Sequence, residues 1–399
     1  MVAWTHDAGS PLAPFADGFR EQLVRLGYTA NSVVTHIVVM GQLSRWLSAA
    51  GLEAGELTWA RVEEFFDARR DCGQRRMPTL VPLMDYLGAQ DVLGPPTSLV
   101  PTPLVELLDL YRCHLVHDRG LAPSTVLCRE RTAGRFLSDR SSAAGGGTGA
   151  EGLTGADVQA FLLGECSVLT VGSAKNRVTE IRSLLRFLRL HGVIEADLAA
   201  AVPPVAGWRD TALPATMSIA SVQALLDSCD RSQPTGMRDF AILILLARLG
   251  LRSCEVAGLG MDDVDWRAGE ISIRGTGGGL DRLPLPADVG EAVVAYLSAG
   301  RPITECRLLF LTCLAPLRGI RPGSIGHVVH RACERSGLPP VSPHRLRHAL
   351  ATEMLAQGVT LMAISQVLRH RDLATTAVYA KVDRISLRTV AQEWPGAGR

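Results

Sequence analysis

Lysine is almost missing from this chain, and aromatic residues are scarce. Lys175 and Lys381 are the only lysines among 41 Lys and Arg residues, and aromatic residues make up 5% of the sequence. A genome rich in G and C accounts for such a bias, because arginine codons then replace lysine codons. Arginine also suits phosphate, since its planar fork binds two oxygen atoms at once. With a net charge of +1, the composition is compatible with a polyanionic partner but does not indicate one.

Long apolar runs and paired cysteines are also absent. The longest apolar stretch, from Phe240 to Leu251, contains Arg248 and falls short of the roughly 18 residues that a membrane span needs. The N-terminus has no basic segment followed by an apolar run, which argues against a signal peptide. The nine cysteines are scattered and none forms a CxxC pair, so we expect no disulfide framework and no metal site. We therefore expect a cytoplasmic protein with no membrane partner.

The first half of the chain contains a weak internal repeat. Three residues match three others at a constant offset of 93 residues: Gly27, Ser32 and Leu43 correspond to Gly120, Thr125 and Phe136. Each copy then has a stretch that begins with Leu-Thr, and each copy ends in an apolar helix. The threonines of the two Leu-Thr pairs, Thr58 and Thr154, are predicted helix N-caps. Amphipathic helices can resemble each other by chance, but the shared order of elements favours two tandem helical modules.

Composition divides the chain into four parts. Residues 1–98 and 99–197 hold the two modules, and Ser141–Gly152 is a predicted flexible Gly/Ser/Ala loop inside the second. Residues 198–216 carry three prolines and are typical of an interdomain linker. Residues 217–399 form the last part, which has a different pattern.

That last part predicts a helical domain with one small sheet. Helices are expected at Ser218–Cys229, at Arg238–Leu249 as a buried element, and from Pro322 onward. The segments Glu270–Ile273 and Leu283–Leu285 flank a glycine-rich turn and predict a β-hairpin. The fold class is therefore mainly α: helical modules followed by an α+β domain with one small antiparallel sheet.

Two segments of this domain place ionisable residues three positions apart, on one face of a predicted helix. In LGLRSCEV, Arg252 and Glu255 are three apart and pair on a helix, which alone is typical of a surface ion pair. In SPHRLRH, Pro343 fits the first turn of a helix, and His344 and Arg347 then share a face near its N-terminus. Free N–H groups and the helix dipole favour anions there, so this end predicts a phosphate site. His348 falls off that face, and a structural role is expected for it.

A third segment, VLRHRDLATTAVY, places Tyr379 nine residues after His370. Alone, Tyr379 is typical of a half-buried tyrosine with a bonded hydroxyl. Together, however, LGLRSCEV, PHRLRH and VLRHRDLATTAVY resemble the three signature boxes of the tyrosine recombinase, or phage integrase, family, in the family's order and spacing. The resemblance runs from about Met217 to Ser386. It implies that residues 217–399 are the catalytic domain.

The resemblance also implies the partners. Residues 99–197 correspond to a SAM-like core-binding domain that closes around duplex DNA together with the catalytic domain, and residues 1–98 are an additional N-terminal helical module. The family acts as a tetramer on DNA, which implies a nucleoid-associated protein. It uses no small-molecule substrate, cofactor or metal.

The family's catalytic roles fall on five residues of this chain. Tyr379 corresponds to the nucleophile that forms a 3′-phosphotyrosyl bond, which splits one hard displacement into two easier ones. Arg252 and Arg347 correspond to the pair that grips the non-bridging phosphate oxygens. His344 corresponds to a general base or an orienting donor, and His370 to a further donor to the phosphate.

One position departs from the family. A hairpin lysine usually protonates the leaving 5′-oxygen, and Thr276 occupies that position here. Arg274 and Arg282 are the nearest basic residues, but arginine is a poor acid. Lost general-acid help is worth about 10²–10⁴ in rate, so we expect normal DNA binding with slow cleavage unless a neighbouring group substitutes for lysine.

DNA contacts are expected from arginines on the helices of the second module, and from the hairpin arginines Arg274 and Arg282. The arginines of the second module are Arg129, Arg177, Arg182 and Arg186. Three functions stay open. The first is a site-specific recombinase, slowed or not by Thr276. The second is a relative that binds DNA without chemistry and acts as a partner or regulator. The third is a type IB topoisomerase-like enzyme, which the two modules before the catalytic domain disfavour.

Overall fold

A computed structural model describes residues 10–67, 80–93, 102–143, 147–206, 217–275, 279–369 and 376. The chain divides into two compact units. One comprises Met1–Leu93 with Asp210–Arg399, and the other comprises Gly94–Arg209. Three large hydrophobic cores correspond to the N-terminal module, the second module and the C-terminal domain, and a small fourth cluster lies around Ala351, Ile364 and Leu368.

The N-terminal module is a small helical bundle. Its elements are α1 (Ala16–Arg25), α2 (Ala30–Ala49), α3 (Trp59–Asp67) and α4 (Val81–Ala89), with short 3₁₀ turns at Ala13–Phe15 and Ala54–Glu56. Phe19, Leu43 and Leu83 are fully buried in its core. As predicted, the Thr58 hydroxyl caps α3 by accepting the Arg61 N–H at 3.3 Å.

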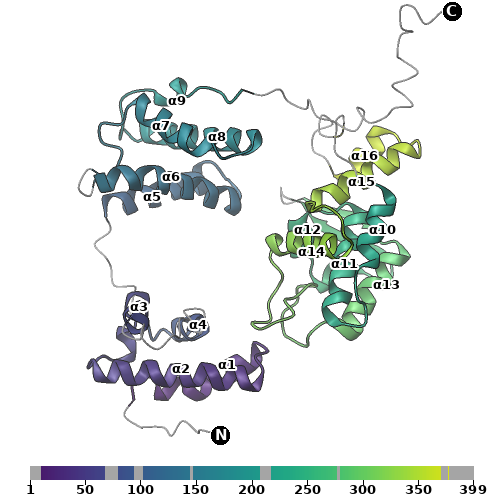
Figure 1. The fold of residues 1–399 in the computed structure, drawn as a ribbon, viewed down its shortest axis with the longest axis horizontal. Helices are drawn as coiled ribbons and strands as arrows, with labels where there is room; N and C mark the ends of the chain where they lie inside the picture. Colours follow the sequence, from purple (N-terminus) through teal and green to yellow (C-terminus); the bar gives the residue numbers. More distant parts are fainter. Residues whose placement is uncertain are drawn as a thin grey trace, which may run out of the picture. The chain divides into compact units, whose positions relative to one another are not determined.

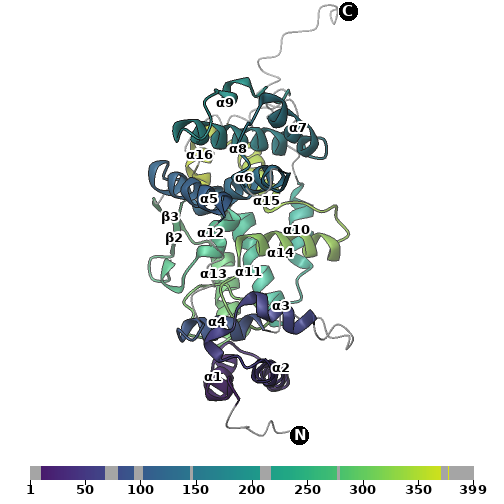
Figure 2. The ribbon, with the colours of Figure 1, turned by 90° about the vertical axis from the view of Figure 1, so that its left-hand side faces the viewer.

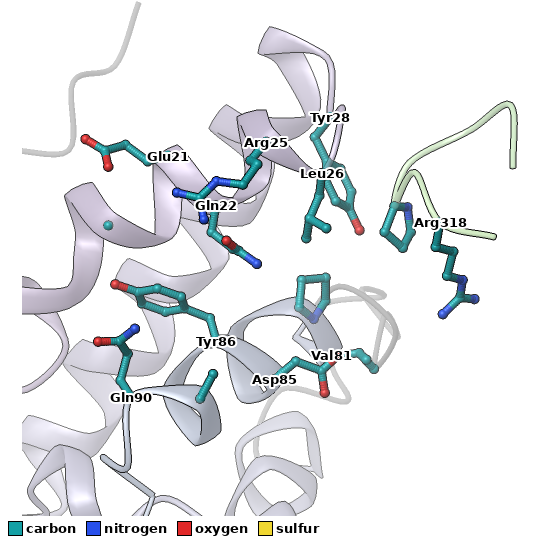
Figure 3. A pocket seen from close by; sticks show the side chains of 14 residues that line it. Glu21, Gln22, Arg25, Leu26, Tyr28, Val81, Asp85, Tyr86, Gln90 and Arg318 are labelled. Atoms are coloured by element: carbon teal, nitrogen blue, oxygen red, sulfur yellow. The ribbon is translucent and has the colours of Figure 1, made fainter. Parts of the chain in front are cut away.

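α1 and α4, together with Pro316 and Arg318 of the C-terminal domain, line a pocket of about 790 Å³ (Figure 3). The side chains around it include Glu21 and Asp85 as well as Arg25, with the ring of Tyr86 between the two helices. Because these charges have both signs, the pocket does not indicate a phosphate site.

The second module repeats the same order of helices. Its elements are α5 (Pro103–Cys113), a π-helical turn (His114–Asp118), α6 (Pro123–Ala143), α7 (Gly155–Cys166), α8 (Val171–Leu190) and α9 (Leu198–Ala201) (Figure 1). α6 begins 93 residues after α2, which is the offset of the sequence repeat. Gly27 and Gly120, which match in the repeat, both have positive φ, at 81° and 55°. Both segments are thus helical with the same order of long helices, and Thr154 caps α7 as predicted.

Two segments of this module differ from the prediction. Ser141–Ala143, at the start of the expected flexible loop, continue α6. At the other end of that loop, the Glu151 carboxylate accepts hydrogen bonds from both the N–H and the hydroxyl of Thr148, which fix the backbone there. Leu198–Ala201 form α9, and Ala199 and Val202 are buried in the module's core. The first residues of the expected linker therefore pack as part of the second module.

The C-terminal domain is built around one buried helix, α11 (Pro234–Leu249), which contacts helices on several sides (Figure 1). The other helices are α10 (Ile219–Asp227), α12 (Ser253–Gly258), α13 (Ala287–Ala295), α14 (Pro322–Arg335), α15 (Pro343–Ala356) and α16 (Leu361–Leu368), with a 3₁₀ turn at Met261–Asp263 and a π-helical turn at Tyr296–Gly300. The predicted helices at Ser218 and at Arg238–Leu249 are confirmed, and those expected from Pro322 onward are confirmed as far as Leu368.

The sheet of this domain is antiparallel, in the order β1 (Val264–Asp265), β2 (Glu270–Arg274), β3 (Leu280–Pro284). Ile271 pairs with Leu283, and both are buried, whereas Arg274 is exposed at the end of β2. Figure 2 shows this hairpin beside α12. The predicted mainly α fold with one small antiparallel sheet is confirmed.

Two further expectations concern membranes and metals. None of the helices in the described part of the chain is long and apolar enough to cross a membrane. The described residues also contain no group of three His, Cys, Asp or Glu side chains that could hold a metal ion.

Candidate active site

Arg252 is positioned by a sharp turn between α11 and α12. Gly250 ends α11 with φ of 57°, and Arg252 is the N-cap residue of α12. Glu255, in the first turn of α12, returns to Arg252 as the i,i+3 spacing predicts. Its Oε2 accepts the Arg252 N–H at 2.8 Å, and its Oε1 accepts from Arg252 Nη1 at 2.7 Å.

This pair is not on the surface. The Glu255 side chain has 0% exposure and that of Arg252 has 25%. Burial opposes ionisation of the carboxyl, but the Arg252 N–H, Arg369 and the Arg252 side chain outweigh it and hold the pKa of Glu255 below its usual range. A buried carboxylate therefore fixes Arg252.

Arg347, in α15, is hydrogen-bonded to the ends of two other helices. Pro343 is the first residue of α15, as predicted, and Arg347 lies one turn further along with 3% exposure. Its Nη1 donates to the carbonyl oxygen of Gly250, at the end of α11, and its Nη2 donates to that of Leu368, at the end of α16. Residues from the three sequence segments thus meet at one point.

The His344 side chain is exposed and lies close enough to Arg347 and Arg252 to be influenced by their charges. Desolvation, then Arg347 and Arg252, lower the pKa of His344, and Glu255 partly opposes them. The His348 ring lies edge-on to the His344 ring, with centroids 6.1 Å apart. His344 is therefore neutral at pH 7, which is the state that can accept a proton.

Arg369 joins the same cluster, although the sequence did not single it out. It follows α16 in the left-handed conformation, with φ of 55°. Its carbonyl oxygen accepts from Arg252 Nη2 at 3.3 Å, and its own Nη2 lies 2.8 Å from Glu255 Oε2. The available signal was its place directly before His370, at the end of an apolar helix.

The candidates of the third segment and the Thr276 position of the hairpin are not described. His370 and Tyr379 lie outside the described residues, and so does Thr276. Thr376, three residues before Tyr379, is described and has 1% exposure. Their roles stay predictions.

Comparison with known proteins identifies the family. A protein of Sinorhizobium fredii (strain NBRC 101917 / NGR234) named "Putative integrase/recombinase y4rA" is 38% identical over 395 residues, which are 97% of this chain and 95% of that protein. The tyrosine recombinase XerD of Mycobacterium tuberculosis (strain ATCC 25618 / H37Rv) is 32% identical over 311 residues, which are 72% of this chain and 95% of XerD. Residues 216–384 match the phage integrase family. This chain belongs to the phage integrase family. It is a tyrosine-type site-specific recombinase, which breaks and rejoins DNA.

Solved structures share the fold of this recombinase. A lambda integrase fragment, solved as a dimer bound to a COC′ core site, has a TM-score of 0.54 at 17% identity and covers 72% of this chain and 96% of its own. XerH, solved in a post-cleavage complex with difH substrate, has a TM-score of 0.53 at 17% identity and covers 74% of this chain and 97% of its own.

The hairpin arginines of the recombinase are exposed. The Arg274 side chain has 68% exposure, and its Nη1 lies 2.9 Å from Asp263 Oδ2. The Arg282 side chain has 70% exposure, and its Nη1 lies 3.7 Å from Glu270 Oε2. Arg274 is therefore hydrogen-bonded to a carboxylate, whereas Arg282 lies only within ion-pair distance of one, and a role for either at the leaving oxygen stays a prediction.

The four arginines of the second module that are expected to bind DNA differ in their surroundings. Arg177 bonds Glu165 and Glu180, at 3.2 and 3.0 Å. Arg129 donates to the Ser183 hydroxyl at 2.9 Å, and Arg182 donates to the Val202 carbonyl at 2.6 Å. Arg186 is exposed. It is thus the candidate whose side chain is best placed for a phosphate.

Proposed function

We propose that this recombinase cuts duplex DNA by attack of the Tyr379 hydroxyl on a phosphodiester. The Tyr379 oxygen forms a bond to phosphorus, the bond from phosphorus to the 5′-oxygen breaks, and a 3′-phosphotyrosyl link remains. A 5′-hydroxyl from the partner strand reverses the step. Because the covalent link keeps the energy of the phosphodiester, rejoining requires neither ATP nor a metal ion.

The observation that carries this proposal is the bonding of Arg347 to Gly250 and Leu368. Residues far apart in the sequence, from all three signature boxes, are thereby brought to one cluster. Two guanidinium groups and a neutral imidazole in that cluster match what phosphoryl transfer needs, which is positive charge for the phosphate oxygens and a proton acceptor for the nucleophile.

Each residue then has a role. Arg252 and Arg347 stabilise the charge that grows on the non-bridging oxygens. The side chain of Arg252 is more exposed than that of Arg347, so Arg252 is the more accessible of the two to an incoming phosphate. His344 takes or orients the Tyr379 proton, and the lowered pKa keeps its ring neutral. His370 donates a further hydrogen bond to the phosphate.

The leaving 5′-oxygen still needs a proton. Thr276 occupies the position of the family's lysine, so water or a hairpin arginine supplies help in its place, and cleavage is slow. Thr276 also supports a second candidate function, in which the chain binds DNA as a partner or regulator and does not cleave it.

Trapping of a covalent adduct tests the proposal. A nicked duplex that carries the recombination site loses a short fragment after cleavage, so the protein stays linked to DNA. The wild type should accumulate this adduct. Tyr379→Phe should form none while its affinity for the same duplex, measured by gel shift, stays within about twofold. Adducts in the Phe variant would refute Tyr379 as the nucleophile, and no adduct in the wild type at long times would favour the second function.

The assembly on DNA belongs to the same proposal. We infer a tetramer on two duplexes, in which the segment from Val382 to Trp394 docks on a neighbouring subunit. Its apolar residues support this: Val382, Ile385, Leu387, Val390 and Trp394. Truncation after Ser386 should reduce synapsis and strand exchange more than binding to a single site. Equal losses in both would show that the segment packs on its own domain.

A further inference from the structure

Arg369 occupies a backbone conformation that arginine rarely adopts. It ends α16 with φ of 55°, where the absence of a Cβ makes glycine the usual residue. Among the described residues, Asp91 is the other non-glycine with positive φ. The backbone at Arg369 therefore costs free energy that glycine would avoid, and the side chain must offset it.

The side chain is buried against the partner of a catalytic arginine. Its exposure is 6%, and its Nη2 lies 2.8 Å from Glu255 Oε2. Its Nη1 donates to the Val367 carbonyl at 3.2 Å, which anchors the guanidinium to the last turn of α16. Arg369 thus reaches from the third signature box to the first.

We propose that Arg369 is a positioning residue, which fixes the orientation of Arg252 through Glu255. The proposal rests on the role of Arg252 given above. It concerns a residue whose side chain is directed to Glu255 and not to the phosphate.

The geometry explains how Arg369 acts. Glu255 Oε1 is bonded by Arg252 Nη1, while Oε2 is shared by the Arg252 N–H and Arg369 Nη2. Because Arg369 occupies Oε2, the guanidinium of Arg252 binds only one oxygen of Glu255. Its Nη2 turns instead to the Arg369 carbonyl at 3.3 Å. A guanidinium has five N–H donors, so the remaining ones stay available for a phosphate.

Loss of the side chain should let Arg252 turn onto both oxygens of Glu255. A bidentate pair with a carboxylate is the preferred geometry of arginine, and it would rotate the guanidinium away from the phosphate. Misplacement of this kind, near 1 Å, can cost about 10²-fold in rate.

The first experiment is single-turnover cleavage by Arg369→Gly. Glycine removes the guanidinium and also the strain of the left-handed backbone, so folding should be retained. We expect cleavage to slow by about 10- to 100-fold, with DNA affinity within about twofold. Arg369→Lys keeps a cation near Glu255 and should recover a measurable part of the rate. Asp91→Gly is the matched control, since it removes a side chain at the other left-handed position, and it should cleave like the wild type.

A double-mutant cycle separates positioning from a general structural effect. If Arg369 acts through the charge of Glu255, Arg369→Gly should cause no further loss of rate in a Glu255→Gln background. Additive losses, or a Gly variant that cleaves within twofold of the wild type, would overturn the proposal, and so would a Lys variant no faster than the Gly variant. Arg252→Ala identifies the other failure. If that variant cleaves normally, the proposed role of Arg252 is wrong, whatever Arg369 does.

Discussion

The Glu255 carboxylate holds Arg252 at two points, its backbone N–H at 2.8 Å and its Nη1 at 2.7 Å. Because Glu255 is buried, removing it leaves the largely buried Arg369 guanidinium without its counter-ion. Glu255→Ala should therefore lower the free energy of unfolding of the catalytic domain by about 3–5 kcal/mol. Urea titration measures the loss.

A surface ion pair provides the control for Glu255→Ala. Arg248 Nε lies 2.8 Å from Asp288 Oδ2, but the two side chains have 57% and 41% exposure. Asp288→Ala should cost about 1 kcal/mol or less, because water replaces the exposed partner. Similar losses in the two variants would mean that burial of Glu255 does not set its contribution.

The pKa of His344 predicts how cleavage depends on pH. Desolvation, Arg347 and Arg252 lower this pKa below the usual value of 6.5, and Glu255 partly opposes them. The proton-accepting neutral ring therefore persists at lower pH than in a free histidine, so the acid limb of the cleavage rate should lie below pH 6.5. The same shift makes His344 contribute to folding stability above the unfolded pKa, and this contribution is lost as pH falls through the folded pKa.

Single-turnover rates across the acid range measure this limb. His344→Gln should slow cleavage and remove the limb, because glutamine does not titrate. A limb centred at or above 6.5 in the wild type, or one that persists in the Gln variant, would assign the titration to a different group.

Gly250 should not tolerate a side chain. Its φ of 57° is left-handed, and a Cβ there would lie 2.8 Å from a methyl carbon of Leu368 and 3.1 Å from one of Leu350. Gly250→Ala should therefore lower the free energy of unfolding by about 1–3 kcal/mol. It should also slow cleavage, since the Gly250 carbonyl holds Arg347. Gly258→Ala is the matched control, because a Cβ there meets nothing within 4 Å. If Gly250→Ala keeps the stability and cleavage rate of the wild type, the side chain of Leu368 in α16 must move to make room for the added methyl group.

Local rules explain which parts of this architecture the sequence predicts. The caps at Thr58 and Thr154, Pro343 at the start of α15 and the pairing of Arg252 with Glu255 all depend on residues within one helical turn. Such signals act through spacing alone, so they can be read directly along the chain.

Tertiary packing decides the rest. The burial of Glu255 and its contact with Arg369, 114 residues away, have no signature in the spacing of either segment. Arg369 also contradicts the local preference for glycine, which only a long-range contact can offset. In the same way, Ala199 and Val202 follow the second module in a proline-rich stretch, and only their burial shows that they belong to its core.

Salt dependence tests how the second module meets DNA. Arg186 is exposed, and we propose that it contacts a phosphate. Arg186→Ala should weaken binding and reduce the log–log slope of affinity against salt by about one unit. Arg248→Ala, which removes an exposed arginine already paired with Asp288, serves as the control and should leave the slope unchanged. An equal slope for Arg186→Ala and the wild type would remove Arg186 from the interface.

The position of Thr276 leads to the last prediction. Thr276→Lys should raise the cleavage rate, by up to about 10²–10⁴ if a general acid is what the site lacks. On either side of it, the Gly275 N–H donates to the Gly279 carbonyl at 2.9 Å, so the pairing of β2 with β3 extends to these two glycines. Like charges from Arg252 and Arg347 would lower the pKa of a lysine brought beside them, which helps a group that must give up its proton.

A 5′-sulfur leaving group separates this explanation from its competitor. Sulfur departs without a proton, so it should accelerate the wild type strongly if the acid is missing, and it should accelerate Thr276→Lys much less. If Arg274 or Arg282 already assists the leaving oxygen, Thr276→Lys should change little and alanine at that arginine should be severely damaging. The ion pairs of these arginines with Asp263 and Glu270 then matter, because each must open before its arginine can reach the DNA. No acceleration by sulfur, together with no gain from lysine, would show that proton delivery to the 5′-oxygen does not limit this recombinase.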